Sequence, residues 1–321
     1  MSLCISVEKK SAGKIIELLR KMNIIDRSRK IASKGDKVLI PVSHVPSDII
    51  QFHEIGIEEC PPLSRMTLNP KIPSLDVLKD IVIIRANALN NIDPNILVKN
   101  ILNIYPNIRS IFIKKGTIGE YRIPLLELLW GEPVEEVVVK EYGFLFKVRL
   151  REVYFNPRLS EEHHRIACMV KNGEVVADLF AGIGGFSIHI AEKSSLVIAN
   201  DMNPVAYDLL VENIKLNKKR LKGTIIPLNM DTRNVDQVLQ NMRVDRIIAN
   251  IPISSLNFHE VYKSILKPGG ILHLYVLSSE LNIVLKDITS IFANWKIVGA
   301  RRVLDHSPGT YIFRIDLIKP Q

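Results

Sequence analysis

A glycine-rich turn in the second half of the chain could bind a nucleotide. It reads Asp178-Leu-Phe-Ala-Gly-Ile-Gly-Gly-Phe186, after an apolar stretch that predicts a strand and before one that predicts a helix. Glycines there let the backbone approach a ligand, and N–H groups at the helix start point toward it. Such turns also form for packing alone, so both interpretations stand here. The spacing from Gly182 and Gly184 to Ser187 departs from the G-x-G-x-x-G pattern of pyrophosphate sites, which disfavours NAD.

Two further acidic residues fall at the ends of the next two predicted strands. Asp201 follows Asn200, where a carboxylate can accept hydrogen bonds from both ribose hydroxyls of adenosine. Its alternative role is that of a carboxylate at a helix N-terminus ahead of Pro204. Asp231 follows the third strand, where it could accept from an adenine amino group. Three acids at three strand ends, without a phosphate-binding lysine, favour an adenosine ligand that lacks phosphates, and S-adenosylmethionine fits this description.

Through these motifs the sequence resembles the class I S-adenosylmethionine-dependent methyltransferases, and more narrowly the archaeal and eukaryotic-type tRNA (guanine-37-N1) methyltransferases. The resemblance also rests on Asn250-Ile-Pro252 after the fourth strand and on Tyr154-Phe-Asn-Pro-Arg158, and it extends over nearly the whole chain. It implies S-adenosylmethionine as cofactor. By resemblance, the residues that bind the cofactor are Arg158, Asp178, Phe180, Gly182, Gly184, Asp201, Asp231 and Asn250.

The resemblance further implies methyl transfer to N1 of guanosine 37 in tRNA. Guanine N1 carries a proton at neutral pH, so the reaction needs a base and a group that stabilises charge growing on O6. By resemblance Glu162 is the general base and Arg122 the catalytic arginine, with Asn250 and Pro252 in the same catalytic set. Glu162 could instead only complement the dipole of a predicted helix from its first turn. Arg122 could instead contact a phosphate.

Other functions remain open from the sequence. Related enzymes of wybutosine synthesis transfer a methyl or aminocarboxypropyl group to C7 of a wyosine precursor, and a non-catalytic tRNA-binding protein is a further alternative. By resemblance, the retained Arg158 and Asn250-x-Pro252 favour transfer of the methyl group to N1. His163 and His164 stand beside two glutamates, but the H-E-x-x-H order of a zinc site is absent, so we predict no metal.

The elements that must position these residues predict an α/β fold. From residue 174 onward, strand-like and helix-like segments alternate, which implies a parallel sheet with right-handed crossovers. Segments 295–303 and 311–317 are joined by so short a connection that at least one must run antiparallel to its neighbour. The predicted fold is a Rossmann-like, doubly wound methyltransferase sheet.

Patterning along the chain predicts four parts. Residues 1–62 form a small α+β module that, by resemblance, binds tRNA, and the proline-containing residues 63–79 form a linker. Residues 80–159 form an α+β substrate-recognition domain. Residues 160–321 form the Rossmann-like catalytic domain that binds S-adenosylmethionine.

Composition and charge agree with a nucleic-acid partner. The 321 residues are 47% hydrophobic and 24% charged, which is typical of a folded globular protein. The net charge of +9 favours a polyanionic partner. By resemblance this partner is tRNA, contacted at its anticodon loop and outer corner. The sequence holds no apolar run long enough to span a bilayer, so we expect no membrane contact. We separately expect a monomer.

The cysteines bear on the compartment. Cys4, Cys60 and Cys168 are odd in number, far apart and never in a C-x-x-C pair. This pattern argues against a disulfide framework. We therefore predict three buried, reduced thiols and a cytoplasmic protein.

Overall fold

The computed structural model describes residues 3–22, 24–26, 31–42, 45, 55–60, 74–89, 92–193, 196–239 and 242–321. The chain forms two compact units, Met1–Lys71 and Ile72–Gln321. Residues 63–73 of the predicted linker lie outside the described residues. Among the described helices, none combines the length and the apolar character needed to cross a membrane.

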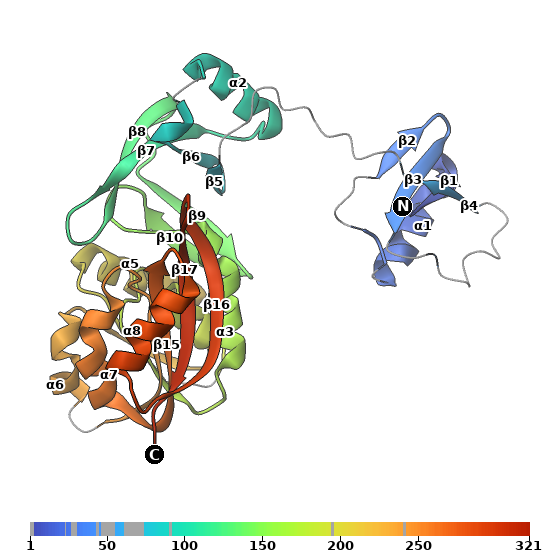
Figure 1. Cartoon of the computed structure of the whole chain (residues 1–321). Helices are drawn as coiled ribbons and strands as arrows, with labels where there is room; N and C mark the ends of the chain where they lie inside the picture. Colours follow the sequence, from blue (N-terminus) through green and yellow to red (C-terminus); the bar gives the residue numbers. More distant parts are fainter. Residues whose placement is uncertain are drawn as a thin grey trace. The chain divides into compact units, whose positions relative to one another are not determined.

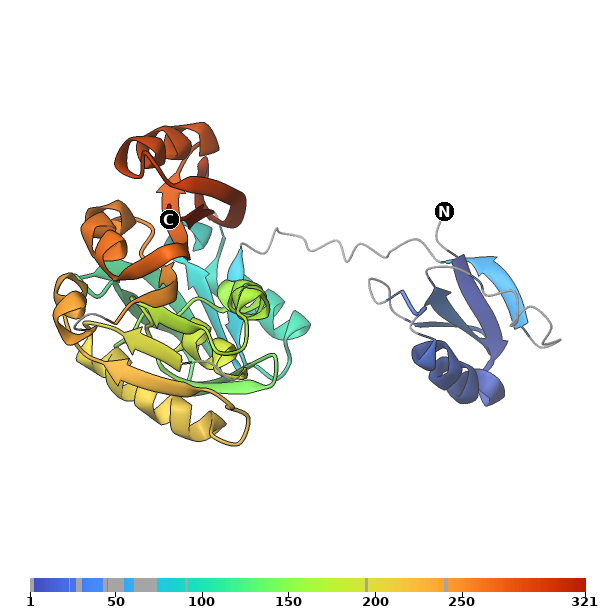
Figure 2. The same ribbon diagram turned by 90° about the horizontal axis from the view of Figure 1, so that it is seen from below.

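The first unit is a four-stranded antiparallel sheet with one helix. The sheet has the order β2-β3-β1-β4, and its strands are β1 (Leu3–Glu8), β2 (Ala32–Lys34), β3 (Lys37–Val42) and β4 (Ile55–Glu59). Helix α1 (Lys9–Lys21) covers one face of the sheet (Figure 2). Its buried Leu19 packs in a core with Ile5 and Ile40 of the central strands.

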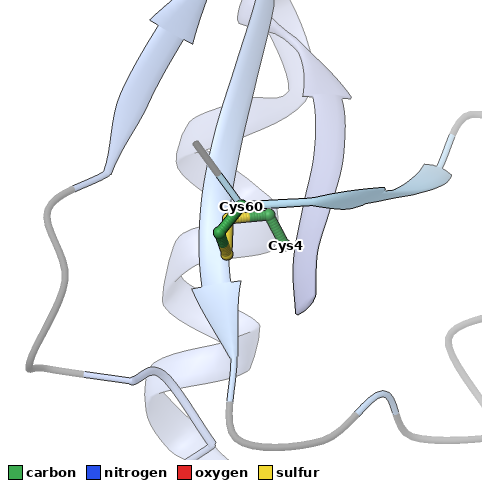
Figure 3. The surroundings of a disulfide bond; sticks show 2 residues. All are labelled: Cys4 and Cys60. Carbon is green, nitrogen blue, oxygen red and sulfur yellow. A yellow bond between two sulfur atoms is a disulfide. The ribbon is translucent and has the colours of Figure 1, made fainter. Parts of the chain in front are cut away.

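A disulfide joins Cys4 to Cys60 in this unit (Figure 3). The prediction of three reduced thiols is therefore wrong, and Cys168 is exposed rather than buried. The physical reason is strand pairing. Cys4 lies opposite Glu58 in the antiparallel pair of β1 and β4, which brings two cysteines 56 positions apart to a Cα separation of 4.9 Å. Spacing along the chain carries no signal of this pairing.

The second unit begins with a four-stranded sheet in the order β5-β6-β7-β8. Its strands are β5 (Leu75–Leu78), β6 (Ile81–Arg85), β7 (Ser110–Ile118) and β8 (Ile123–Gly131). The 3-10 turn η1 (Ala86–Leu89) and helix α2 (Pro94–Ile104) connect the parallel strands β6 and β7. Strand β5 lies inside the range 63–79 that the sequence predicts as a linker. These residues form a strand of the sheet because their backbone pairs with β6 and Leu78 is buried.

Strands β9 (Glu136–Glu141) and β10 (Phe144–Arg149) form a hairpin. Its apolar face is buried, with Val137, Val139, Phe144 and Phe146 in one core. Helix α5 (Pro204–Asn217) completes the free edge of β10. The side-chain amides of Asn213 and Asn217 bond the backbone of Lys147 and Leu145 at 2.7–3.2 Å. These bonds join residues of the predicted recognition and catalytic domains within one compact unit.

A seven-stranded sheet forms the rest of the second unit, in the order β13-β12-β11-β14-β15-β17-β16 (Figure 1). Its strands are β11 (Val175–Asp178), β12 (Leu196–Asn200), β13 (Thr224–Leu228), β14 (Val244–Ala249), β15 (Leu266–Ser278), β16 (Lys296–Ser307) and β17 (Thr310–Ile318). The first five pair in parallel, and β17 runs antiparallel to both β15 and β16. The predicted alternation and the antiparallel end strand are confirmed.

Helices cover both faces of this sheet, which makes it doubly wound. One core contains buried residues of α6 (Val235–Leu239), α7 (His259–Ile265) and α8 (Leu281–Ile291). The other contains residues of α3 (Ser160–Met169), α4 (Gly185–Ile190) and α5. Since both faces are buried, the central strands read as continuous apolar runs. The Rossmann-like prediction is confirmed.

Candidate active site

A cavity opens where β11, β12 and β14 end, at their carboxyl ends. Open α/β sheets bind ligands at this edge. Several predicted site residues line the cavity: Arg122, Phe180, Gly182, Asp201, Asn250 and Pro252. Other predicted residues, all described in the structure, lie outside its wall: Arg158, Glu162, Asp178, Gly184 and Asp231.

The glycine turn needs its glycines for conformation and for close packing. Gly182 has φ +55° and Gly184 φ +99°, values at which other residues are strained. A Cβ atom on Gly184 would lie 2.7 Å from Leu210 of α5. Gly184 therefore lets α4 pack on α5, while Gly182 presents its backbone to the cavity.

Asp178 stabilises the turn from behind the cavity wall. Its buried carboxylate accepts a hydrogen bond of 2.6 Å from the Ser187 hydroxyl in α4. Burial, with repulsion from Asp201, raises the pKa of Asp178 to about 6 despite that bond. In this structure Asp178 orients the turn, and the prediction that it contacts the cofactor stays a prediction.

Asp201 does line the cavity, and it ties the end of β12 to the glycine turn. Its two oxygens accept hydrogen bonds from the backbone N–H groups of Gly182 at 2.8 Å and Asn203 at 2.9 Å. Burial raises the pKa of this carboxyl. Each carboxylate oxygen has a second lone pair. Asp201 can therefore also accept from two ligand hydroxyls.

Asp231 has a local partner instead. It caps the 3-10 turn η3 (Thr232–Asn234) by accepting from the Arg233 backbone N–H at 2.9 Å. It also accepts from the Arg233 guanidinium at 2.6–3.0 Å, and these bonds lower the pKa of Asp231.

Sequence reasoning missed Asn200, whose buried amide bonds Met230 and Thr232 and so fixes the end of β13 beside the cavity.

Arg122 occupies the turn between β7 and β8 with φ +54°, a left-handed conformation that is uncommon for arginine. Strained backbone of this kind clusters at functional sites. Its guanidinium lies 5.5 Å from the centre of the Tyr154 ring, and the Lys114 ammonium lies 5.7 Å from the same ring. Both cations therefore contact the same aromatic ring.

A second, basic hollow adjoins the cavity and shares Arg122, Tyr154 and His306 with it. Arg85, Lys114 and Arg158 also line this hollow, with the carboxylates of Asp76 and Asp305. Burial, together with the nearby cations Arg122, Arg85 and Lys114, lowers the pKa of His306. Sequence reasoning missed Arg85, Lys114 and His306, because they come from separate strands and share no motif.

Arg158 has partners in and just before β5, the first strand of the unit. It donates to Asp76 at 2.6 Å and to Ser74 at 2.7 Å. These bonds anchor β5 to the 3-10 turn η2 (Pro157–Leu159) ahead of α3. The predicted contact of Arg158 with the cofactor stays a prediction.

Glu162 and its neighbour Glu161 have opposite environments in the first turn of α3. The Glu162 side chain is 4% exposed, and its Oε1 accepts from the Tyr275 hydroxyl at 2.9 Å and from Arg314 at 2.5 Å. Glu161 is exposed and pairs with Arg301 at 3.3 Å. The Glu162 carboxylate is thus bound to β15 and β17.

Three buried side chains meet beneath α3. Glu141 of β9 lies 3.0 Å from His163 and 3.6 Å from His189 of α4. Burial opposes ionisation of Glu141, but contacts with both histidines outweigh it and lower its pKa to about 2. These donor types also suit zinc. Because His163 already hydrogen-bonds the carboxylate, that bond accounts for the contact, and the prediction of no metal stays a prediction.

Comparison with known proteins decides the family. Residues 137–296 match the TRM5/TYW2 methyltransferase domain, and residues 4–50 match the tRNA methyltransferase 5 N-terminal domain. The tRNA (guanine(37)-N(1))-methyltransferase Trm5b of Pyrococcus abyssi is 30% identical over 333 residues, which cover 98% of each chain. This chain belongs to the TRM5/TYW2 methyltransferase family.

Solved structures of this family are similar over both units. The structure of aTrm5 in complex with tRNALeu has a TM-score of 0.68 and 29% identity, covering 99% of each chain. Methanocaldococcus jannaschii Trm5 in complex with adenosine has a TM-score of 0.66 and 28% identity, again over 99% of each chain. The family resemblance predicted from the sequence is confirmed.

In this member of the TRM5/TYW2 family, the two hollows differ in chemistry. The cavity combines the apolar ring of Phe180 with the Asp201 acceptor and the Gly182 backbone, a set that suits an adenosine. The basic hollow offers Lys and Arg side chains to an anion. Arg122 lines both, so it can reach a group that lies between the two ligands.

Proposed function

We propose that this methyltransferase transfers a methyl group from S-adenosylmethionine to N1 of guanosine 37 in tRNA. One observation carries the proposal: a cavity suited to adenosine adjoins a basic hollow, and Arg122 belongs to both walls. The named activity of the Pyrococcus abyssi relative supports it, as do relatives solved with adenosine and with tRNA.

The residues that fit the cofactor are those of the cavity wall. Asp201 would accept from the ribose hydroxyls, and Phe180 and Gly182 would contact the nucleoside. Bound S-adenosylmethionine supplies the methyl group as an electrophile. Asn250 and Pro252 line the same cavity and belong to the proposed catalytic set.

The protein's own groups then handle the proton and the charge. Glu162 would take the proton from guanine N1, which leaves the N1 electron pair free to form the new bond. Arg122 would stabilise the negative charge that grows on O6. The methyl group arrives from a sulfonium, so the anionic guanine and the cationic donor both become neutral.

The tRNA contacts are assigned by unit. The basic hollow of the second unit would hold phosphates around the anticodon loop, because lysine and arginine contacts position nucleic-acid backbone. The first unit matches the tRNA methyltransferase 5 N-terminal domain, and we assign it to the outer corner of the tRNA.

Nucleoside mass spectrometry tests the reaction. We expect 1-methylguanosine from an unmodified tRNA transcript incubated with protein and S-adenosylmethionine, and none from the matched transcript with adenosine at position 37. No modification of the guanosine transcript would contradict the proposal. A methyl or aminocarboxypropyl product on a wyosine-precursor tRNA alone would assign the protein to the C7 reaction instead.

A further inference from the structure

The carboxylate proposed as the base is held by partners outside the cavity wall. Glu162 Oε1 accepts from Arg314 of β17 at 2.5 Å and from Tyr275 of β15 at 2.9 Å. Both Glu162 and Arg314 are buried. The Glu162 carboxylate held there does not line the cavity that Arg122 and Asn250 line.

Arg314 has a second carboxylate partner that would remain if Glu162 moved. Asp316, on the same strand, lies 2.9 Å from Arg314 Nε and 3.1 Å from Arg314 Nη2. His273 also contacts Asp316 at 2.6 Å. Removing one member of a buried ion pair is costly when it strands the other charge. Since Asp316 accepts a hydrogen bond from Arg314 Nη2 and lies at ion-pair distance from Nε, departure of Glu162 leaves Arg314 paired with a carboxylate on β17.

We propose that Arg314 is a positioning residue that, with Tyr275, holds the Glu162 carboxylate away from the cavity until the guanine docks, and that Asp316 then retains Arg314. The inference rests on the proposed function, in which Glu162 is the base. Only the released carboxylate can reach the proton on guanine N1. The contact thus separates a resting state of the base from a reacting state.

Charged and titratable groups face Glu162 from α3, β15 and β17. Arg165, on the same helix, approaches Oε2 to 3.8 Å and is partly exposed. Tyr275 faces it from β15, and burial raises the pKa of this phenol well above its ordinary value, so Tyr275 stays a hydrogen-bond donor. From β17 come Arg314 and, behind it, Asp316 with its partner His273. Among these groups Arg314 is the fully buried cation in direct contact.

The test compares two pH profiles of Arg314→Met. Single-turnover methylation at limiting enzyme reports the groups of the free enzyme, whereas the rate at saturating enzyme reports those of the complex. At limiting enzyme the methylation rate falls as the pH is lowered. Loss of the Arg314 cation should raise the midpoint of this fall by roughly one pH unit or more. The midpoint at saturating enzyme should stay where it is in wild type, because Arg314 has by then released the base. The rate at limiting enzyme should rise about tenfold above pH 8, within the coupling range of contacting residues.

Two further variants keep the test decisive. Arg314→Met combined with Asp316→Asn removes both charges of the β17 pair and serves if the single variant fails to fold. Arg301→Met is the matched control: it removes the exposed cation paired with Glu161 and should move neither midpoint. Unmoved midpoints in the folded Arg314 variants would overturn the inference and leave Arg314 a structural ion pair. Movement of both midpoints would overturn it too, since Arg314 would then stay on Glu162 during reaction.

Glu162→Gln separates this inference from the proposed function. If Glu162→Gln, with Arg314 unchanged, keeps the wild-type rate and pH profile, Glu162 is not the base. Both that part of the proposed function and the inference about Arg314 would then be wrong. A large rate loss in Glu162→Gln together with unmoved midpoints in the Arg314 variants would leave the base assigned and refute only its restraint.

Discussion

Adjacent carboxylates at the start of α3 differ in burial, and the proposed function assigns chemistry to the buried one. We expect Glu162→Gln to lower the single-turnover methylation rate by roughly 10²-fold, the usual contribution of a positioned base. Gln keeps an acceptor oxygen for Tyr275 and Arg314, so the fold and both ligands should be retained. The control Glu161→Gln loses only an exposed pair and should react at the wild-type rate. The reverse pattern would move the base by one position.

The raised pKa of Asp178 predicts a pH dependence of stability. Its value in the folded protein is about 6, against 3.8 ordinarily. The folded state therefore holds this proton more tightly, and the stability it contributes is present below pH 4 and lost as the pH rises through 6. Asp178→Asn mimics the protonated form and can still accept from Ser187. We expect the free energy of unfolding of the variant, relative to that of the wild type, to increase by up to about 3 kcal/mol between pH 4 and pH 7.

Urea titrations followed by tryptophan fluorescence measure this difference, because Trp130 and Trp295 both belong to the second unit. A difference that does not change with pH would show that Asp178 is already ionised in the folded protein at pH 4.

The sequence predicts where individual site residues stand better than which neighbours they bond. The position of Asp201 followed from its place at a strand end, and the structure puts it in the cavity wall. Asp178 and Asp231 stand at equivalent strand ends, but neither lines the cavity: Asp178 is buried and bonds Ser187, and Asp231 bonds Arg233. Strand position fixes where a side chain starts and leaves open which neighbour it bonds. For Glu162, spacing alone allowed a dipole role, and the family resemblance supplied the catalytic one.

At the scale of elements, the glycine turn couples the cavity to the packing of α4 on α5. We expect Gly184→Ala to destabilise the second unit by roughly 1–3 kcal/mol, because it combines strained φ with a Cβ 2.7 Å from Leu210. It should also weaken the binding of S-adenosylmethionine, as measured by calorimetry. Gly173→Ala is the matched control, with φ +83° but no atom within 4 Å of the added Cβ. Equal effects of the two variants would assign the cost to backbone strain alone.

Element prediction succeeded where both faces of a strand or one face of a helix are buried. The alternation from β11 to β15 was evident because each buried strand is a short apolar run between turns. Strands β5 and β8 escaped prediction. β5 is four residues long. In β8 the apolar residues stand in groups on both sides of Glu127 instead of alternating, and among them Leu126 is buried while Leu125 and Trp130 are exposed. Their pairing with β6 and β7 depends on long-range contacts that a local pattern does not contain.

At the scale of the molecule, the cavity and all its lining residues belong to the second unit. We therefore expect a chain lacking residues 1–71 to bind S-adenosylmethionine like the full chain. Its methylation of full-length tRNA should slow by at least roughly tenfold, because a second contact on the same ligand is lost. An isolated anticodon stem-loop, which lacks the outer corner, should be methylated equally by both chains. Equal losses on the two substrates would contradict the assignment of the first unit to the outer corner.

The bond between Cys4 and Cys60 makes almost the whole first unit a covalent ring. One cut by a protease within that ring opens the polypeptide without freeing a fragment, since the sulfur bridge still joins the two sides of the cut. A nicked protein should migrate at full length on a gel without reductant and separate into two pieces once thiol is added. Under oxidising conditions, damage to the backbone of this unit therefore leaves its pieces tethered to the methyltransferase.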